Sequence, residues 1–465
     1  MNCNSNNITS KKVFQEAVKL SFPLVISQFL FMSSGFISNL MLSRVSENAF
    51  AAGLFINVIQ IILVTVIFGL LSSLSPLIGK VIGQKQQLEH VGQLFISGCI
   101  ISFLLCIPII CTLYFIEPIM LAIGQPPSLA QQCALYFHIY LWSIPAAGLI
   151  SVFIQLLLGT FKQIIVFAYS IGNLFLSSIL SYILIFGKLG SPALGLEGLA
   201  WAVSISSWLA VILLGTFILR HPDYRDNKLL NLKNKNIRKQ MASITKLGLP
   251  VSIHIGNEMF SFLFVITMVG WISIEALNMQ QIVTRYLLMF AIPIYGLSQA
   301  ITVSISKQFG AKNISEIQSI GQAYIKIGII YSVFLLVVFT TIPDTLISLF
   351  IENKSENTNM YYTLSIILIL VAVGQIFDSI KNIITGALRG LHDTKFPMKV
   401  SIIIAWPIGV PLAYLMGFTY NGGLIGITLA HIITIALVCI CLYLRWIKLC
   451  RNMTSFIGFQ EAKEM

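Results

Sequence analysis

The chain contains 465 residues, of which 57% are hydrophobic and only 10% are charged, and its mean hydropathy is +0.88. Soluble domains carry about 25% charged residues, so this composition excludes a soluble protein and indicates one that crosses a membrane many times. A formal net charge of +12 would suggest a nucleic-acid partner in a soluble chain. We expect no nucleic-acid partner here, because the basic residues are explained by membrane orientation.

Apolar runs of about twenty residues recur along the chain, without the strict alternation of polar and apolar residues that a β-barrel requires. The pattern predicts an all-α polytopic membrane protein with about twelve transmembrane helices. The expected spans are residues 17–41, 49–77, 91–116, 130–158, 163–187, 194–219, 246–270, 274–304, 318–342, 360–386, 397–418 and 422–446.

The placement of positive charge predicts the orientation of these spans. Of the 29 Lys and Arg residues, 24 fall at one surface, three (Arg44, Lys188 and Lys354) at the other, and two (Arg285 and Lys381) inside spans. Cytoplasmic loops carry such an excess of Lys and Arg. We therefore expect a multi-pass protein of the cytoplasmic (inner) membrane with both termini in the cytoplasm.

The two halves of the chain repeat each other at a nearly constant offset. Pro23 matches Pro250 at an offset of 227 residues, and Gly195 matches Gly423 at 228. Several such matches at one offset favour an internal duplication. Each copy would hold six spans, an even number, so both copies insert with the same orientation and a pseudo-two-fold axis along the membrane normal relates them.

A basic segment separates the two copies. It begins at Arg220 and carries eight Lys or Arg residues against two Asp up to Lys246. We expect a six-helix N-terminal lobe of residues 1–219, a cytoplasmic linker of residues 220–245 and a six-helix C-terminal lobe of residues 246–465.

Two ionisable residues, Asp378 and Lys381, lie within a late apolar span. At 1.5 Å per residue, Asp378 lies about 16 Å from Arg389, in the loop expected at the cytoplasmic surface, and thus near the centre of a slab about 30 Å thick. Glu258 lies about 18 Å along its own helix from Lys246 and so at a similar depth. An unpaired charge there costs several kcal/mol, which makes such residues functional candidates.

The two carboxylates suggest cation chemistry. A carboxylate in a low-dielectric cavity binds Na⁺ through its oxygens or takes up a proton, because burial raises its pKa. Na⁺ is the candidate metal at Glu258 and Asp378, and we expect no cofactor besides Na⁺ or H⁺ as coupling ion. His254, one turn before Glu258, is either a proton relay or a hydrogen-bonded packing residue. Gln375, three residues before Asp378, and Ser38 of the first span are further candidates for a secondary site, together with His254.

The motif around Asp378 resembles the multidrug and toxic compound extrusion (MATE) family of efflux antiporters. The resemblance rests on a Gln-x-x-Asp run from Gln375 followed by Gly-Ala-Leu-Arg-Gly-x-x-Asp-Thr from Gly386. It extends over nearly the full length through glycine and proline patterns at residues 194–202, 248–258 and 409–426. In that family, acids at the positions matching Glu258 and Asp378 serve cation binding and coupling, so the resemblance implies these roles here.

Three residues depart from the family pattern. Ser38 stands where many members carry an Asp, and a Ser cannot bind a proton in the physiological pH range. Lys381 occupies a position that is commonly Gln, and Arg285 one that is commonly Asn. A protonation switch in the N-terminal half is therefore not expected at Ser38.

Lys381 lies three residues after Asp378, on the same helix face, and its side chain leans toward the N-terminal end of the helix. We expect its ammonium either to pair with Asp378 in the place of a sodium ion, or to extend to the cytoplasmic surface about 12 Å away. Arg285 would pair with Glu258 in the same way if their helices meet. The pairing hypothesis predicts weaker Na⁺ binding than in relatives with Gln at this position.

These residues favour a secondary antiporter that exports amphipathic or cationic organic compounds in exchange for Na⁺ or H⁺. The alternative is a related flippase for a lipid-linked sugar or another anionic amphiphile, which Lys381 and Arg285 keep open. An enzyme is not expected, because neither a His-Glu-x-x-His motif nor a nucleotide-binding Gly-x-x-x-x-Gly-Lys-Ser/Thr motif occurs. We expect small amphipathic molecules and the bilayer as partners, and a monomer.

Overall fold

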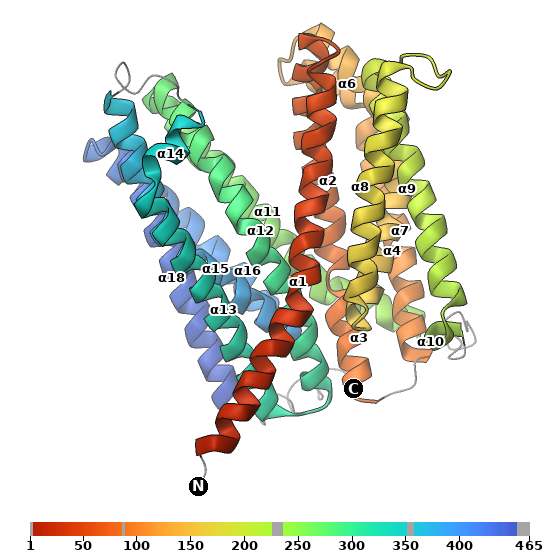
Figure 1. Cartoon of the computed structure of the whole chain (residues 1–465), viewed down its shortest axis with the longest axis vertical. Helices are drawn as coiled ribbons and strands as arrows, with labels where there is room; N and C mark the ends of the chain where they lie inside the picture. Colours follow the sequence, from red (N-terminus) through yellow and green to blue (C-terminus); the bar gives the residue numbers. More distant parts are fainter. Residues whose placement is uncertain (1–2, 86–88, 226–235, 351–357, 453–465) are drawn as a thin grey trace. The chain divides into compact units, whose positions relative to one another are not determined.

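The computed structural model describes residues 3–85, 89–225, 236–350 and 358–452, and every regular element in this part of the chain is helical (Figure 1). The predicted all-α class is thereby confirmed. The chain divides into two compact units. The N-terminal unit is Ile26–Ser252, and the C-terminal unit combines Met1–Val25 with Ile253–Met465.

The N-terminal unit starts within α1 (Cys3–Leu42) and ends within α11 (Ile237–Ile272). The elements between them are α2 (Glu47–Leu71), α3 (Leu74–Gly83), α4 (Glu89–Tyr114), α5 (Ile116–Ala122), α6 (Pro127–Tyr140), α7 (Ser143–Gly159), α8 (Gln163–Phe186), α9 (Gly195–Arg220) and α10 (Pro222–Arg225).

The C-terminal unit contains the remainder of α11 and the first part of α1. Its other elements are α12 (Ile274–Gly310), α13 (Ile314–Thr341), α14 (Pro343–Ser348), α15 (Thr358–Gly390), α16 (Lys395–Ile404), η1 (Ala405–Gly409), α17 (Val410–Tyr414), η2 (Leu415–Thr419) and α18 (Gly423–Arg451). The segments η1 and η2 are single turns of π-helix, which in other proteins often occur at functional positions.

Ten helices in the described part of the chain are long and apolar enough to cross a membrane, and the bent pair α6 and α7 brings the number to eleven. The second expected span, residues 49–77, is instead divided between α2 and α3. Ser72 and Ser73 stand at the break and donate their hydroxyl groups to the carbonyl oxygens of Gly69 and Leu70. α2 alone has 25 residues, so a helix long enough to cross a membrane is present at this expected span.

The unit boundaries differ from the expected lobe boundaries at two helices. The first part of α1 belongs to the C-terminal unit, and the first part of α11 belongs to the N-terminal unit. Gly296 of α12 allows α1 to approach closely, since a Cβ there would lie 2.8 Å from the backbone nitrogen of Val25. Gly248 of α11 likewise lies against the carbonyl group of Leu70 in α2.

The sequence repeat is also visible in the backbone. Lys85 and Lys312, which match at an offset of 227, follow α3 and α12 with φ angles of 52° and 56°. Gly195 and Gly423, which match at 228, begin α9 and α18 with φ angles of 55° and 53°. Left-handed backbone is uncommon, so its occurrence at equivalent positions supports the proposed duplication.

Close packing of α12 against α15 sets the position of the late polar residues of α15. Gly386 and Gly390 leave no side chain between the helices, and a Cβ at Gly390 would lie 2.7 Å from the carbonyl oxygen of Thr302. The Ser298 hydroxyl donates to the carbonyl oxygen of Asn382 at 2.8 Å, and the Thr302 hydroxyl donates to that of Gly386 at 2.9 Å. This part of α15 is therefore fixed on its α12 side.

Candidate functional site

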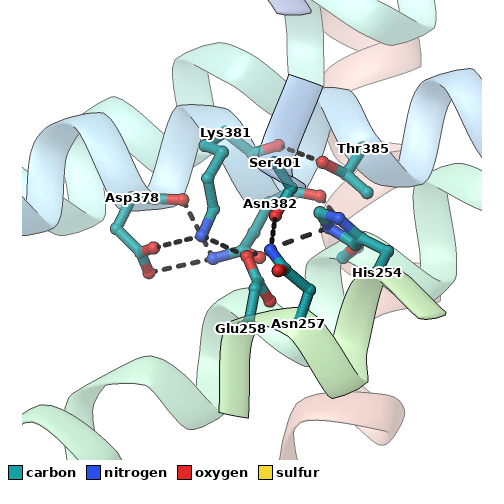
Figure 2. Close-up of polar contacts among 9 residues, drawn as sticks. His254, Asn257, Glu258, Asp378, Lys381, Asn382, Thr385 and Ser401 are labelled. Atoms are coloured by element: carbon teal, nitrogen blue, oxygen red, sulfur yellow. Dashed lines mark hydrogen bonds and ion pairs between the residues drawn. The ribbon is translucent and has the colours of Figure 1, made fainter. Parts of the chain in front are cut away.

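A polar cluster lies in the C-terminal unit, where α11, α15 and α16 meet (Figure 2). α15 contributes Asp378, Lys381 and Asn382 at helical spacings of three and four residues, which place them on one side of the helix. α11 contributes His254 and Glu258, which are four residues apart. The four residues that the sequence singled out at mid-span, His254, Glu258, Asp378 and Lys381, are thus brought together.

Lys381 bridges the two carboxylates. Its Nζ lies 2.7 Å from Oε1 of Glu258 and 2.9 Å from Oδ1 of Asp378 (Figure 2). These are charge-assisted hydrogen bonds of ordinary length. The ammonium is folded back onto the acids, and its side chain is only 10% exposed. Lys381 therefore does not extend to the cytoplasmic surface in this conformation.

The second oxygen of Asp378 is also occupied. Asn382 donates from Nδ2 to Oδ2 of Asp378 at 2.9 Å and to the backbone carbonyl oxygen of Asp378 at 3.0 Å. The other side of Asn382 is held by Ser298, as described above. Both oxygens of Asp378 thus have a donor, and the donors come from its own helix.

Glu258 is more accessible than Asp378. Its side chain is 35% exposed, against 19% for Asp378. His254 is buried, and its Nε2 lies 3.8 Å from Oε1 of Glu258, which is beyond hydrogen-bond distance. Its Nδ1 is buried and has no hydrogen-bond partner in the described part of the chain. His254 therefore contacts the acid without holding it in place.

Asn257 connects the cluster to α16 and η1. Its Nδ2 donates to the hydroxyl oxygen of Ser401 at 2.8 Å, and its Oδ1 accepts from Nε1 of Trp406 at 2.8 Å. Trp406 belongs to η1, the first π-helical turn. Asn257 directly precedes Glu258 in α11. Its two hydrogen bonds therefore hold the Glu258 backbone next to α16 and the π-helical turn η1.

Arg285 does not join the cluster, and the expectation that it pairs with Glu258 is wrong for this conformation. Its guanidinium lies over the ring of Phe350, 5.8 Å from the ring centroid. Glu258 forms its ion pair with Lys381 instead, and His254 lies beside it. Arg285 therefore lies near the end of α14, where its guanidinium makes a cation–π contact instead of an ion pair with a carboxylate.

The two other candidates have separate environments. Ser38 belongs to the N-terminal unit, where its hydroxyl donates to the carbonyl oxygen of Ser34 at 2.9 Å. Gln375 is buried, and its backbone carbonyl accepts from the Ser332 hydroxyl at 3.4 Å. The Nε2 of Gln375 has no hydrogen-bond partner among the described residues.

Sequence reasoning did not single out Asn257, Asn382, Ser401 or Trp406. Asn382 could have been found, since it lies four residues after Asp378 and hence on the same side of the helix. Asn257 precedes a candidate acid but faces a different neighbour. Its bonds to Ser401 and Trp406 depend on how α11 packs against α16, for which the sequence carries no local signal.

The comparisons with known proteins point to one family. The model of the MatE family matches residues 23–183 and 250–415. A probable multidrug resistance protein NorM of Mesorhizobium japonicum is 27% identical over 445 residues, which cover 94% of each chain. A multidrug resistance protein NorM of Burkholderia vietnamiensis is 29% identical over 410 residues, which cover 87% of each chain.

A solved structure shows the same fold. The bent form of the Vibrio cholerae MATE transporter VcmN superimposes with a TM-score of 0.86, covering 97% of this chain and 99% of that one, at 15% sequence identity. At this identity the likeness concerns the fold alone. The two matched segments of the family model fall on the two halves of the predicted repeat.

Proposed function

Because the chain belongs to the MATE family of membrane transporters, we propose that it is a secondary antiporter that exports amphipathic or cationic organic compounds in exchange for Na⁺ or H⁺. Membership makes it a multi-pass membrane protein that moves small molecules and not an enzyme. The observation that carries the proposal is the pair of carboxylates, Glu258 and Asp378, held by one ammonium among apolar helices.

The two acids provide a means of coupling. A carboxylate among apolar helices requires a positive partner, because an unpaired charge is costly there. A cation arriving at Glu258, which is 35% exposed, competes with Lys381 for the same oxygens. An organic cation and a coupling ion then cannot bind at the same time, and the carrier opens to the other side of the membrane with either one bound. Export of the organic cation is thereby linked to entry of the coupling ion.

The family relatives support the substrate class. Both NorM proteins are described as multidrug resistance proteins, so we extend export of diverse organic compounds to this chain.

Uptake of ethidium into inside-out vesicles tests the proposal, with an imposed Na⁺ gradient in one series and an imposed pH gradient in another. We expect one of the two gradients to drive accumulation. Uptake that neither gradient changes would show that the carrier is not an antiporter of this kind.

The orientation is proposed from the sequence. With 24 basic residues at one surface and three at the other, we place both termini and the linker of residues 220–245 in the cytoplasm, in the inner membrane. Residues 226–235 of that linker lie outside the described residues. A cysteine introduced at Asn231 should react with an impermeant thiol reagent only after the cells are opened. Reaction in intact cells would reverse the orientation.

A flippase for an anionic amphiphile is the second candidate. Lys381 supports it, because its ammonium lies among apolar helices and could receive a phosphate or carboxylate of a lipid-linked sugar. The same ammonium already contacts two acids, which favours the antiporter. Translocation of a fluorescent undecaprenyl-phosphate-linked sugar by reconstituted protein, with no effect of ethidium, would favour the flippase instead.

A further inference from the structure

The geometry of the C-terminal unit points to a built-in counter-ion. We infer that the ammonium of Lys381 replaces a bound sodium ion between Glu258 and Asp378. Lys381 therefore prevents Na⁺ from binding to these two acids in the C-terminal unit. The inference rests on the proposed function only in assigning ion coupling to these two acids. It identifies Lys381 as the residue that determines which coupling ion the carrier accepts.

The ammonium occupies the position that a shared cation would take. Nζ of Lys381 is in hydrogen-bond contact with both Oε1 of Glu258, at 2.7 Å, and Oδ1 of Asp378, at 2.9 Å. A hard cation such as Na⁺ binds through oxygen ligands, and these two carboxylate oxygens are the charged ligands in the cluster. A sodium ion placed between them would have to displace Nζ.

The remaining contacts do not offer an alternative sodium position on Asp378. Its Oδ2 accepts a hydrogen bond from Asn382 at 2.9 Å, so a donor faces the second oxygen as well. On the Glu258 side, Nε2 of the buried His254 lies 3.8 Å from Oε1. Oε1 of Glu258 and both carboxylate oxygens of Asp378 thus each already face a nitrogen atom, whereas a sodium ion needs oxygen ligands.

The tether favours the ammonium over a free ion. Lys381 is fixed to α15 three residues from Asp378, so its binding to the acids is intramolecular. A tethered group acts at an effective concentration in the millimolar range or above, and it loses no translational freedom when it binds. External Na⁺ must therefore compete with a tethered group at this effective concentration and also overcome repulsion by the displaced ammonium. The same tether neutralises one of the two negative charges in the unloaded carrier.

Na⁺ binding to purified full-length protein tests the inference without any transport step. We would measure thermal unfolding in NaCl and in choline chloride at equal ionic strength, and ²²Na⁺ binding by scintillation proximity. For the wild type we expect no Na⁺-specific stabilisation. For Lys381→Gln we expect Na⁺ affinity to rise about tenfold or more, because a unit positive charge next to the site is removed.

Two further variants separate charge from packing. Lys381→Met, which also removes the charge, should gain Na⁺ binding, and Lys381→Arg, which keeps it, should not. In the Lys381→Gln background, Glu258→Gln should abolish the gained Na⁺ binding, which would locate the ion at these acids. The inference is overturned if the wild type itself binds ²²Na⁺ and is stabilised by NaCl relative to choline chloride, a result that requires no variant to fold well.

This inference and the proposed function can fail separately. If the wild type ignores Na⁺ and the neutral variants bind it, Lys381 is the counter-ion even if no drug export is found, in which case the proposed function alone fails. If drug export is Na⁺-driven in the wild type, this inference fails and the antiporter proposal stands.

Discussion

Replacing Gly386 by Ala tests how closely α12 and α15 pack beside the acid cluster. The added Cβ would lie 2.7 Å from the Ser298 hydroxyl oxygen and 2.9 Å from Cγ2 of Ile301, whereas ordinary contact begins at 3.4 Å. The backbone carbonyl oxygen of Ser298 lies nearer still, so the helices must separate by more than 0.7 Å, the difference between 3.4 and 2.7 Å, and overpacking of this kind typically costs about 1–3 kcal/mol.

The separation also strains the two interhelical hydrogen bonds made by Ser298 and Thr302, each contributing about 1 kcal/mol. Alanine regains about 1 kcal/mol through its higher helix propensity. The net loss is about 3 kcal/mol, which corresponds to a melting temperature lower by about 6–12 °C for a unit of this size.

Thermal unfolding followed with a thiol-reactive fluorophore measures this loss. Cys439 of α18 is 5% exposed, so in a protein that keeps it as the single cysteine it reacts when the C-terminal unit unfolds. Gly256→Ala in α11 is the matched control, because a Cβ there meets no described atom within 4 Å. An unchanged melting temperature for Gly386→Ala would refute the close helix contact and, with it, the placement of Asp378 and Lys381.

Three further predictions follow from other contacts. Asn257→Leu should lower the free energy of unfolding by about 2 kcal/mol and slow export, because two hydrogen bonds, one of them from Trp406, are lost. Arg285→Gln should leave the ion dependence of export unchanged, since the guanidinium lies away from the acids; a changed dependence would contradict its placement. At the end of α9, a hydrogen bond from Lys162 and its charge lower the pKa of Asp223 below its ordinary 3.8. This ion pair stabilises the fold above that value and is lost as the pH falls through the lowered pKa, so Asp223→Asn should have a lower melting temperature than the wild type at neutral pH and the same one in strong acid.

Part of the site could be predicted because it is local to one helix. The pairing of Lys381 with Asp378 follows from a spacing of three residues and from the lean of helical side chains. The bridge from Lys381 to Glu258 depends on the packing of two helices that are far apart in sequence. The similar depth of Glu258 and Asp378 in the membrane was consistent with a shared site, but the contact between Lys381 and Glu258 is seen only in the structure.

For Arg285, depth in the membrane was not enough to predict the partner of the side chain. Its position in an apolar span suggested a buried ion pair, yet the direction of a side chain around its helix decides which neighbour it meets. Here that neighbour is Phe350. The all-α class was predicted from composition and run length, whereas the break between α2 and α3, at Ser72 and Ser73, falls inside an apolar run that gives no signal of it.

The central claim is that Glu258 and Asp378 couple ion entry to export. The most direct test measures ethidium transport by reconstituted Glu258→Gln and Asp378→Asn proteins, once under an imposed ion gradient and once as exchange without a gradient. Glu275→Gln, an exposed acid in the first turn of α12, is the matched control. We predict that both site variants lose gradient-driven transport while the control keeps it. Gradient-driven transport at the wild-type rate in either well-folded site variant would contradict the account.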